Sequence, residues 1–414
     1  MIVTSLLLCA ALLQQDSLAP MERRERTDLQ FLAADAREGR GVGTKGLQDA
    51  GAYIAAAFKR AGLRPGGDSG TYFQRFFIPA DAPAVLHTAF GGTPVRNVVG
   101  YVPGSSPALA GEVVVIGAHY DHLGLGGFGS LDPDSTGRVH NGADDNGSGT
   151  TALLELARRL GTTKPARTIV LVAFTGEELG DLGSDYYVKH SPHGPIDSVY
   201  VMLNMDMVGR MKNDRLIVLG AATATEFAAL LDSLNGSQFD LRASGDGWGP
   251  SDHASFYGAH RPVLHFFTDL HEDYHRTTDD WQKIDFPDLA RVTTFVERVA
   301  WTLANRPGAL TFVNAPPPVV STTGGGYGAY LGTIPDMSGS PGGVRITGVR
   351  AASPAEKAGL AGGDVITAIG DKIVANLYDM TDALRAHQAG DSVVIVVKRG
   401  EQTLRLNAVL GKRP

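Results

Sequence analysis

The sequence predicts an α/β fold in which a mixed, mostly parallel β-sheet is sandwiched by helices, followed by a small α+β domain. Three continuous apolar runs, residues 111–118, 168–174 and 199–204, support the first part. Runs of this length that are rich in β-branched residues are typical of strands buried on both faces, as in parallel or mixed sheets covered by helices. A composition break after Leu310, followed by a second strand-rich pattern, predicts the additional domain.

The segment before these runs predicts helices and then antiparallel strands. Residues 27–65 read as two helices around a glycine-rich turn, with apolar positions at helical spacing in the second helix: Ala50, Ile54, Ala57 and Phe58. Residues 71–80 and 94–104 are expected to form antiparallel strands at the margin of the sheet.

The first 20 residues have the pattern of a signal peptide. An apolar run, MIVTSLLLCAALL, precedes a polar stretch, although no Lys or Arg stands before it. The alternative is a short buried helix, and the run is too short to span a membrane, which needs about 20 apolar residues. We therefore expect export to the periplasm or exterior of a bacterium.

Composition agrees with a large soluble enzyme. The chain has 414 residues, of which 43% are hydrophobic and 20% charged, which is ordinary globular usage. The net charge of -7 and the lack of basic runs argue against nucleic acid as a partner.

Polar side chains follow each of the three predicted buried strands. His119 comes directly after the first, Glu177 and Glu178 after the second, and Asp206 after the third. Because ligands gather at the carboxyl ends of strands in such sheets, we expect these side chains to meet at one edge.

Two further motifs complete a set of metal-binding residues. Asp145 lies in a glycine-rich turn before the amphipathic run 150–160, and His275 lies in the segment DYHRTTDD. Two imidazoles and three carboxylates suit a pair of zinc ions that share one carboxylate. Metal-binding His residues commonly donate their other ring nitrogen to a carboxylate, and Asp121 and Asp252 are the candidates for that role.

These motifs, in their order, resemble the M28 family of zinc metallopeptidases over roughly residues 25–305. The resemblance implies the zinc exopeptidase fold for residues 21–310 and two zinc ions bridged by Asp145. It implies that His119 and Asp206 complete one metal site, and that Glu178 and His275 complete the other. It also implies that Glu177 is the general base and that Tyr274, directly before the last His, helps to stabilise the oxyanion.

The function that this resemblance implies is that of an aminopeptidase. Such an enzyme hydrolyses the N-terminal residue from peptides with a free N-terminus through a metal-bound hydroxide, whose proton Glu177 would accept. The alternative on the same fold is a glutaminyl-peptide cyclase, which uses one zinc ion and carries Trp where Tyr274 stands. A third possibility is a peptide-binding scaffold with a degenerate peptidase domain, against which the complete ligand set argues.

The C-terminal part predicts a linker and a peptide-binding module. Residues 311–326 contain three consecutive prolines and then a glycine cluster, a composition typical of linkers. Residues 327–414 resemble a PDZ domain of the bacterial protease-associated kind, most specifically in segment 353–374. PDZ domains bind C-terminal peptides by adding a strand to a sheet edge.

The PDZ resemblance also assigns a groove. The loop that would bind the terminal carboxylate comprises Tyr330, Leu331, Gly332 and Thr333, and the side-chain pocket would be lined by Met380 and Leu384. The alternative is a structural appendage with a vacant groove.

Overall fold

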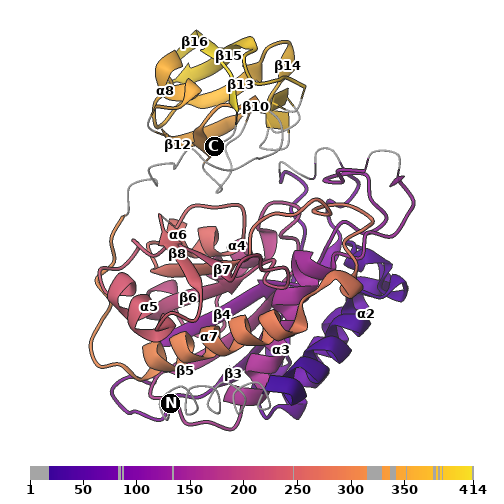
Figure 1. Cartoon of the computed structure of the whole chain (residues 1–414), viewed down its shortest axis with the longest axis vertical. Coiled ribbons are helices and arrows are strands. Elements are labelled where there is room, and N and C mark those ends of the chain that lie inside the picture. Colours follow the sequence, from indigo (N-terminus) through magenta and orange to yellow (C-terminus); the bar gives the residue numbers. More distant parts are fainter. Residues whose placement is uncertain are drawn as a thin grey trace, which may run out of the picture. The chain divides into compact units, whose positions relative to one another are not determined.

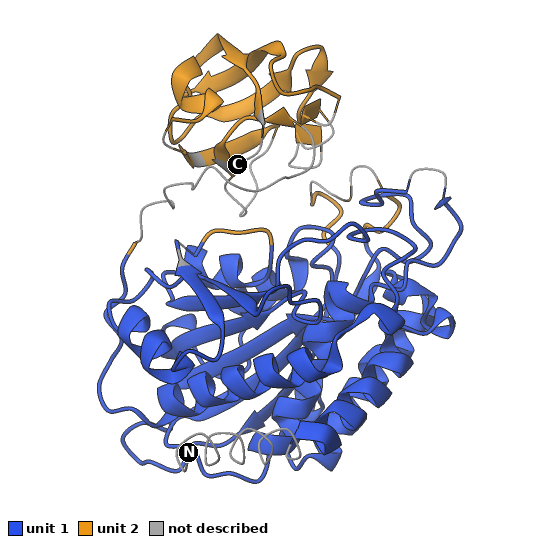
Figure 2. Ribbon diagram, viewed as in Figure 1, with its two compact units in different colours: residues 1–78, 92–247, 251–313 blue, residues 79–91, 248–250, 314–414 orange. Residues whose placement is uncertain are grey.

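The computed structural model describes residues 18–412, except for residues 83–84, 86–87, 133–134, 246, 315–328, 336–341, 351, 376–378, 381–382 and 385. The described chain divides into two compact units (Figure 2). The first comprises residues 1–78, 92–247 and 251–313, and the second residues 79–91, 248–250 and 314–414. The predicted linker, residues 311–326, lies mostly outside the described residues.

The first unit is built on a nine-stranded sheet, counted over the described residues (Figure 1). The spatial order is β1-β3-β5-β4-β6-β9-β7-β8, and β2 pairs with β3. The strands are β1 (Arg64–Pro65), β2 (Phe73–Phe77), β3 (Pro94–Val102), β4 (Val113–His119), β5 (Thr168–Phe174), β6 (Val199–Met205), β7 (Arg215–Leu219), β8 (Asp240–Ser244) and β9 (Val263–Phe267).

The centre of the sheet is parallel, antiparallel pairs join it to both margins, and the edge pair β7–β8 is again parallel. Strands β5, β4, β6 and β9 run parallel to one another, with His119 at the end of β4 beside Phe174 at the end of β5. Strands β1, β2 and β5 all pair with β3 in the antiparallel sense, and β7 pairs with β9 in the same way. The predicted mixed sheet is therefore confirmed.

Helices cover both faces of this sheet, which explains why β4 and β6 are buried along their whole length. Consecutive residues of a strand point to opposite faces. On β9, the ring of His265 stacks on His253 of α6, whereas Phe266 packs against Phe295 of α7. Helices α3 and α7 contact each other, and so do α4 and α6, giving one layer on each side (Figure 1).

The helices of the first unit include a helix at residues 18–32 and several short 3-10 or π segments. They are η1 (Asp35–Arg40), α2 (Lys45–Arg60), η2 (Asp68–Gly70), η5 (Ala143–Ser148), α3 (Gly149–Leu160), α4 (Leu182–Lys189), η6 (Ile196–Ser198), α5 (Phe227–Asn235), α6 (His253–Gly258), η7 (Trp281–Lys283) and α7 (Phe286–Asn305).

Helix α2 has the buried face that the sequence predicts. The hydroxyl of Thr44 accepts a hydrogen bond from the amide of Leu47, which caps the N-terminus of the helix. The four apolar positions of the predicted face are all buried: Ala50, Ile54, Ala57 and Phe58.

Among the described residues, no helix is both long and apolar enough to cross a membrane.

The second unit contains a six-stranded antiparallel sheet of order β11-β12-β13-β15-β16, with β14 paired to β13, and a separate β10-β17 ladder, counted over its described residues. Its elements are β10 (Ala329–Tyr330), β11 (Thr333–Pro335), β12 (Val344–Val349), α8 (Pro354–Ala358), β13 (Val365–Ile369), β14 (Lys372–Ile373), β15 (Ser392–Arg399), β16 (Gln402–Val409) and β17 (Gly411–Lys412).

The predicted groove residues lie beside the core of the second unit. Leu331 and Met380 are buried in it, and Leu384 is partly buried against it. Gly332 has a positive φ of 85°, a conformation in which glycine has no steric cost. A Cβ at this position would meet the Cβ of Ser353 at 2.3 Å, so the close approach of the two segments also requires glycine here.

Candidate metal centre

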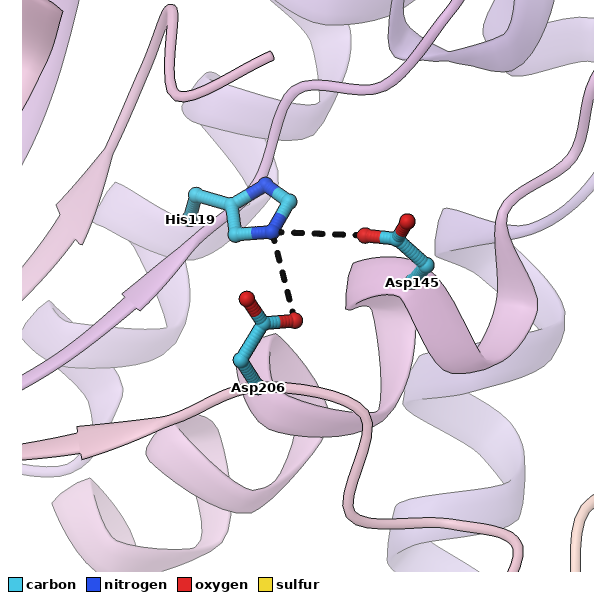
Figure 3. Close-up of side chains that lie close together, drawn as sticks. All are labelled: His119, Asp145 and Asp206. Carbon is cyan, nitrogen blue, oxygen red and sulfur yellow. Dashed lines mark ion pairs between the residues drawn. The ribbon is translucent and has the colours of Figure 1, made fainter. Parts of the chain in front are cut away.

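Three residues from different elements form the first group of possible metal ligands. His119 ends β4, Asp206 directly follows β6, and Asp145 lies within η5, which leads into α3. The Nε2 atom of His119 lies 3.4 Å from Oδ1 of Asp145 and 3.4 Å from Oδ1 of Asp206. Figure 3 shows both carboxylates turned toward this nitrogen. All three side chains are buried.

A second group faces the other oxygen of the same carboxylate. The Nε2 atom of His275 lies 3.1 Å from Oδ2 of Asp145 and 3.2 Å from Oε2 of Glu178. Glu178 follows β5 by four residues, and His275 lies in the loop after β9. Asp145 therefore stands between two sets of ligands, in the position expected of a bridging residue.

Backbone carbonyls orient the two histidine rings. Nδ1 of His275 lies 2.8 Å from the carbonyl oxygen of Gly129, and Nδ1 of His119 lies 3.2 Å from that of Asp121. With a proton on each Nδ1, both rings donate to these carbonyls and present the lone pair of Nε2 to the carboxylates. This arrangement fixes the tautomer that metal binding needs.

Buried charged groups hold the loop that carries Asp145. Asp279 accepts hydrogen bonds from the amides of Asp144 and Asp145. The guanidinium of Arg40 is fully buried and donates to the carbonyl oxygens of Asn141 and Gly142. Burial raises the pKa of Asp279 to about 6 and lowers that of Arg40 to about 10. Hydrogen bonds with Asp279 and Arg40 thus fix the backbone on both sides of Ala143, in the loop that carries Asp145.

The two adjacent glutamates have different environments. The Asp121 carboxylate accepts hydrogen bonds from the amides of both Glu177 and Glu178, at 3.3 and 3.4 Å, which fixes the turn after β5. Burial raises the pKa of Glu177 well above its usual range. Burial would raise the pKa of Glu178 as well, but the facing His275 and His122 imidazoles bring it to about 2. Neighbouring groups with separated pKa values are a pattern of acid–base sites.

Tyr274 and Asp252 also lie in buried surroundings. The Tyr274 ring stacks on His275 with centroids 3.9 Å apart, and burial raises its pKa well above the usual value, so the phenol stays protonated. Asp252 is completely buried directly before α6, and burial raises its pKa to about 7. A contact with the Ser184 hydroxyl opposes this rise, and the predicted role of Asp252 as an acceptor for a ligand ring stays a prediction.

Three contributors were missing from the sequence-based site. Ser251 donates to Oδ2 of Asp206 at 2.8 Å and leaves Oδ1 facing His119. The Gly129 carbonyl orients His275, and His122 forms a hydrogen bond with Glu178. Ser251 and the Gly129 backbone leave no signal in the sequence, whereas the second imidazole of the motif GAHYDH is visible in it.

The donor set fits a pair of zinc ions. Nε2 of His119 and Oδ1 of Asp206 are buried and lie 3.4 Å apart, which is longer than a good hydrogen bond, so a cation between them could bind both atoms. Two ligands of one tetrahedral zinc ion lie about 3.3 Å apart, given bonds of about 2.0–2.1 Å. The separations of 3.1–3.4 Å in both groups match that spacing.

Comparisons with known proteins agree with this geometry. Residues 97–300, which hold every ligand named so far, match the model of peptidase family M28. The chain contains a peptidase family M28 domain. Residues 328–410 match a PDZ domain model, so the M28 domain is followed by a PDZ domain. Aminopeptidase YwaD of Bacillus subtilis (strain 168) is 40% identical over 98 residues, which are 24% of this chain and 18% of that protein.

The matched regions cover less than half of the length of the first four curated relatives. Among solved structures, a zinc aminopeptidase from Bacillus subtilis superposes with a TM-score of 0.55 at 18% identity, covering 69% of this chain and 95% of that one. A glutaminyl cyclase from Bacteroides thetaiotaomicron superposes with a TM-score of 0.53 at 20% identity, covering 68% and 97%. The M28 domain thus has the zinc exopeptidase fold.

Proposed function

We propose that the protein is a co-catalytic zinc aminopeptidase that removes N-terminal residues from peptides with a free N-terminus. The observation that carries this proposal is the position of Asp145, whose two oxygens each face a different histidine, at 3.4 and 3.1 Å. In this proposal Asp145 would bridge two zinc ions, His119 and Asp206 would complete one site, and Glu178 and His275 would complete the other.

The proposed chemistry combines the metals with a general base. Two bound zinc ions supply Lewis acidity, which acidifies a water molecule and polarises the scissile carbonyl. Glu177 accepts the proton of the attacking water and passes it to the leaving amine. This role is supported by the distance of 3.8 Å between Oε2 of Glu177 and Nε2 of His119, a proposed ligand of the first site.

Tyr274 supports hydrolysis as the outcome. Its protonated phenol can donate a hydrogen bond to the oxyanion that forms when water adds to the carbonyl. The stacking of the Tyr274 ring on His275 supports such a role, because His275 belongs to the proposed second metal site. Tyr274 therefore favours an aminopeptidase over a glutaminyl-peptide cyclase.

For the PDZ domain we propose that the edge of β11 captures the C-terminus of a peptide. Strand β11 pairs with β12 on one side, and the loop of residues 330–333 leads into it. Backbone amides of that loop would hold the terminal carboxylate, with Met380 and Leu384 beside the side-chain pocket.

For residues 1–20 we propose a signal peptide. Sequencing the N-terminus of the exported protein would test this proposal.

A substrate screen combined with zinc analysis tests the catalytic proposal. The purified protein would be offered aminoacyl anilides, the same compounds with a blocked amine, and peptides that begin with Gln. We expect about two zinc ions per chain and cleavage of the free-amine compounds alone. Cyclisation of N-terminal Gln with one zinc ion would instead indicate the cyclase, and two zinc ions with no turnover would indicate a binding scaffold.

A further inference from the structure

His122, the second imidazole of the motif GAHYDH, lies against the second metal site without belonging to the proposed ligand set. Its Nδ1 is 2.6 Å from Oε1 of Glu178, and its side chain is buried. The ring meets that of His275 edge-on, with centroids 5.8 Å apart. His122, Asp145 and Glu178 together are close enough to be considered as a metal-binding group.

The separations between atoms distinguish a ligand from a hydrogen-bond donor. Co-ligands of one tetrahedral zinc ion lie about 3.3 Å apart. The 2.6 Å between His122 and Glu178 is much shorter, and the 4.0 Å between Nδ1 of His122 and Oδ1 of Asp145 is longer. A short contact between an imidazole nitrogen and a carboxylate oxygen is typical of a charge-assisted hydrogen bond.

The surroundings of His122 indicate which nitrogen carries the proton. Nε2 is buried and has no hydrogen-bond partner among the described residues. A proton on Nε2 would be an unsatisfied buried donor, which is costly, so the neutral tautomer with the proton on Nδ1 is favoured. In this tautomer His122 donates to Oε1 of Glu178.

The ring and the carboxylate are both held in place. The amide of His122 donates to the carbonyl oxygen of Arg40 at 3.2 Å. The His122 ring packs against Gly142, because a Cβ added to Gly142 would lie 2.4 Å from Cγ of His122. Glu178 therefore has one oxygen bound to His122 and the other, Oε2, 3.2 Å from Nε2 of His275.

We propose that His122 is a positioning residue that sets the affinity of the second zinc site. By holding Oε1 of Glu178, it leaves Oε2 as the single oxygen directed at the metal. The proposal rests on the two-zinc centre put forward above. It predicts that His122 acts on the site formed by Glu178 and His275, and that it leaves the site formed by His119 and Asp206 almost unchanged.

The test compares two substitutions at this position. The amide nitrogen of Asn can replace Nδ1 of His as a donor, so His122→Asn keeps the hydrogen bond, whereas His122→Leu removes it. Zinc affinities of the metal-free proteins would be measured by competition with a coloured chelator. We expect His122→Leu to weaken the second site by about 10–100-fold, as outer-shell substitutions do, and His122→Asn to stay within about threefold of the unchanged protein.

Two results would overturn the role of His122. One is unchanged affinity of both sites in His122→Leu. The other is loss of zinc binding at the second site in His122→Asn, which would indicate that His122 is itself a ligand. The His122→Asn measurement decides between the two roles even if His122→Leu does not fold. Fewer than two zinc ions in the unchanged protein would contradict the two-zinc centre itself, so the two failures are distinguishable.

Discussion

At the scale of single residues, the site depends on the hydrogen bonds that orient the side chain of each proposed ligand. His119 and His275 each use one ring nitrogen for a backbone carbonyl, and the other nitrogen then faces Asp145. The carboxylate of Asp206 is oriented in the same manner, because its Oδ2 accepts a hydrogen bond from the Ser251 hydroxyl. Hydrogen bonds to the outer atoms of the ligands therefore decide which atoms remain for the metals.

The adjacent glutamates allow a matched pair of substitutions. Glu177→Gln should keep both zinc ions but lower turnover by about a hundredfold or more, because the proposed general base is removed. Glu178→Gln should lose zinc from the second site, because a neutral amide is a poor ligand. Zinc content and anilide hydrolysis would be measured for both variants. Unchanged turnover in Glu177→Gln would remove Glu177 from the mechanism.

His119, Glu178 and Asp206 are predictable from the sequence because each follows a buried strand, and Asp145 is predictable because it precedes a helix. His275 lies in the loop after β9 and is predictable only from its motif. His119 and Asp206 could be placed at one sheet edge from the apolar runs before them. His122 could not be assigned a partner, since its contact with Glu178 joins residues 56 positions apart. The contributions of Ser251 and the Gly129 carbonyl likewise depend on tertiary distances that no local pattern encodes.

At the scale of elements, Arg40 at the end of η1 connects three segments of the first unit. Its guanidinium donates to the carbonyl oxygens of Leu32, Tyr120, Asn141 and Gly142. These carbonyls belong to the end of the first helix, the residue after β4 and the loop before Asp145. The glycine-rich turn that the sequence predicts between two helices, which contains Arg40, is thus attached to the loop before Asp145.

Replacement of Arg40 should show this connection. A Lys side chain keeps the charge but cannot reach four carbonyls, so Arg40→Lys should lower the free energy of unfolding by at least about 3 kcal/mol, through buried acceptors left unpaired. Urea unfolding of the metal-free protein measures the effect. The control is Arg60→Lys, at an exposed position at the end of α2. Equal stability of the two variants would contradict the role given to Arg40.

In the second unit, an ion pair should give a pH-dependent contribution. Arg399 makes two hydrogen bonds with Asp364, at 2.6 and 2.8 Å. Burial alone would raise the pKa of Asp364, but the bonds from Arg399 and the Ala361 amide lower it. Because the folded pKa is depressed, the stabilisation is present above the unfolded pKa of about 3.9 and is lost as the pH falls through the folded value.

Asp364→Asn should therefore speed hydrogen exchange in β13 and β15 at pH 7 but have little effect at pH 2, relative to the unchanged chain at the same pH. The effect should be modest, below about 1 kcal/mol, because Arg399 is partly exposed. Glu401→Gln, at an exposed turn, serves as the control. An equal effect of Asp364→Asn at both pH values would contradict this account.

At the scale of the whole molecule, all proposed ligands and Glu177 lie in the first unit. The parallel centre of the sheet was predictable because β4, β5 and β6 are continuous apolar runs. Strands β7 and β8 were not predicted, since short, partly exposed strands leave a weak pattern. Residues 311–313, which the sequence assigns to the linker, pair with residues 223–225 of the first unit. The proline-rich composition of the predicted linker does not reveal this pairing.

Deletion of the residues after Val313 tests the independence of the M28 domain. Because the complete ligand set remains, kcat/KM for a small aminoacyl anilide should stay within about twofold of the full chain. The full-length protein, assayed at the same zinc content, is the control. A large loss of activity would mean that the PDZ domain contributes to the catalytic site.

The central claim is that one carboxylate, that of Asp145, serves both metals. The most direct measurement is the zinc content of Asp145→Ala beside that of the unchanged protein, after dialysis against a weak chelator. The shared ligand predicts about two zinc ions in the unchanged protein and loss of both from the variant. A variant that retains one tightly bound zinc ion would contradict the bridging role of Asp145.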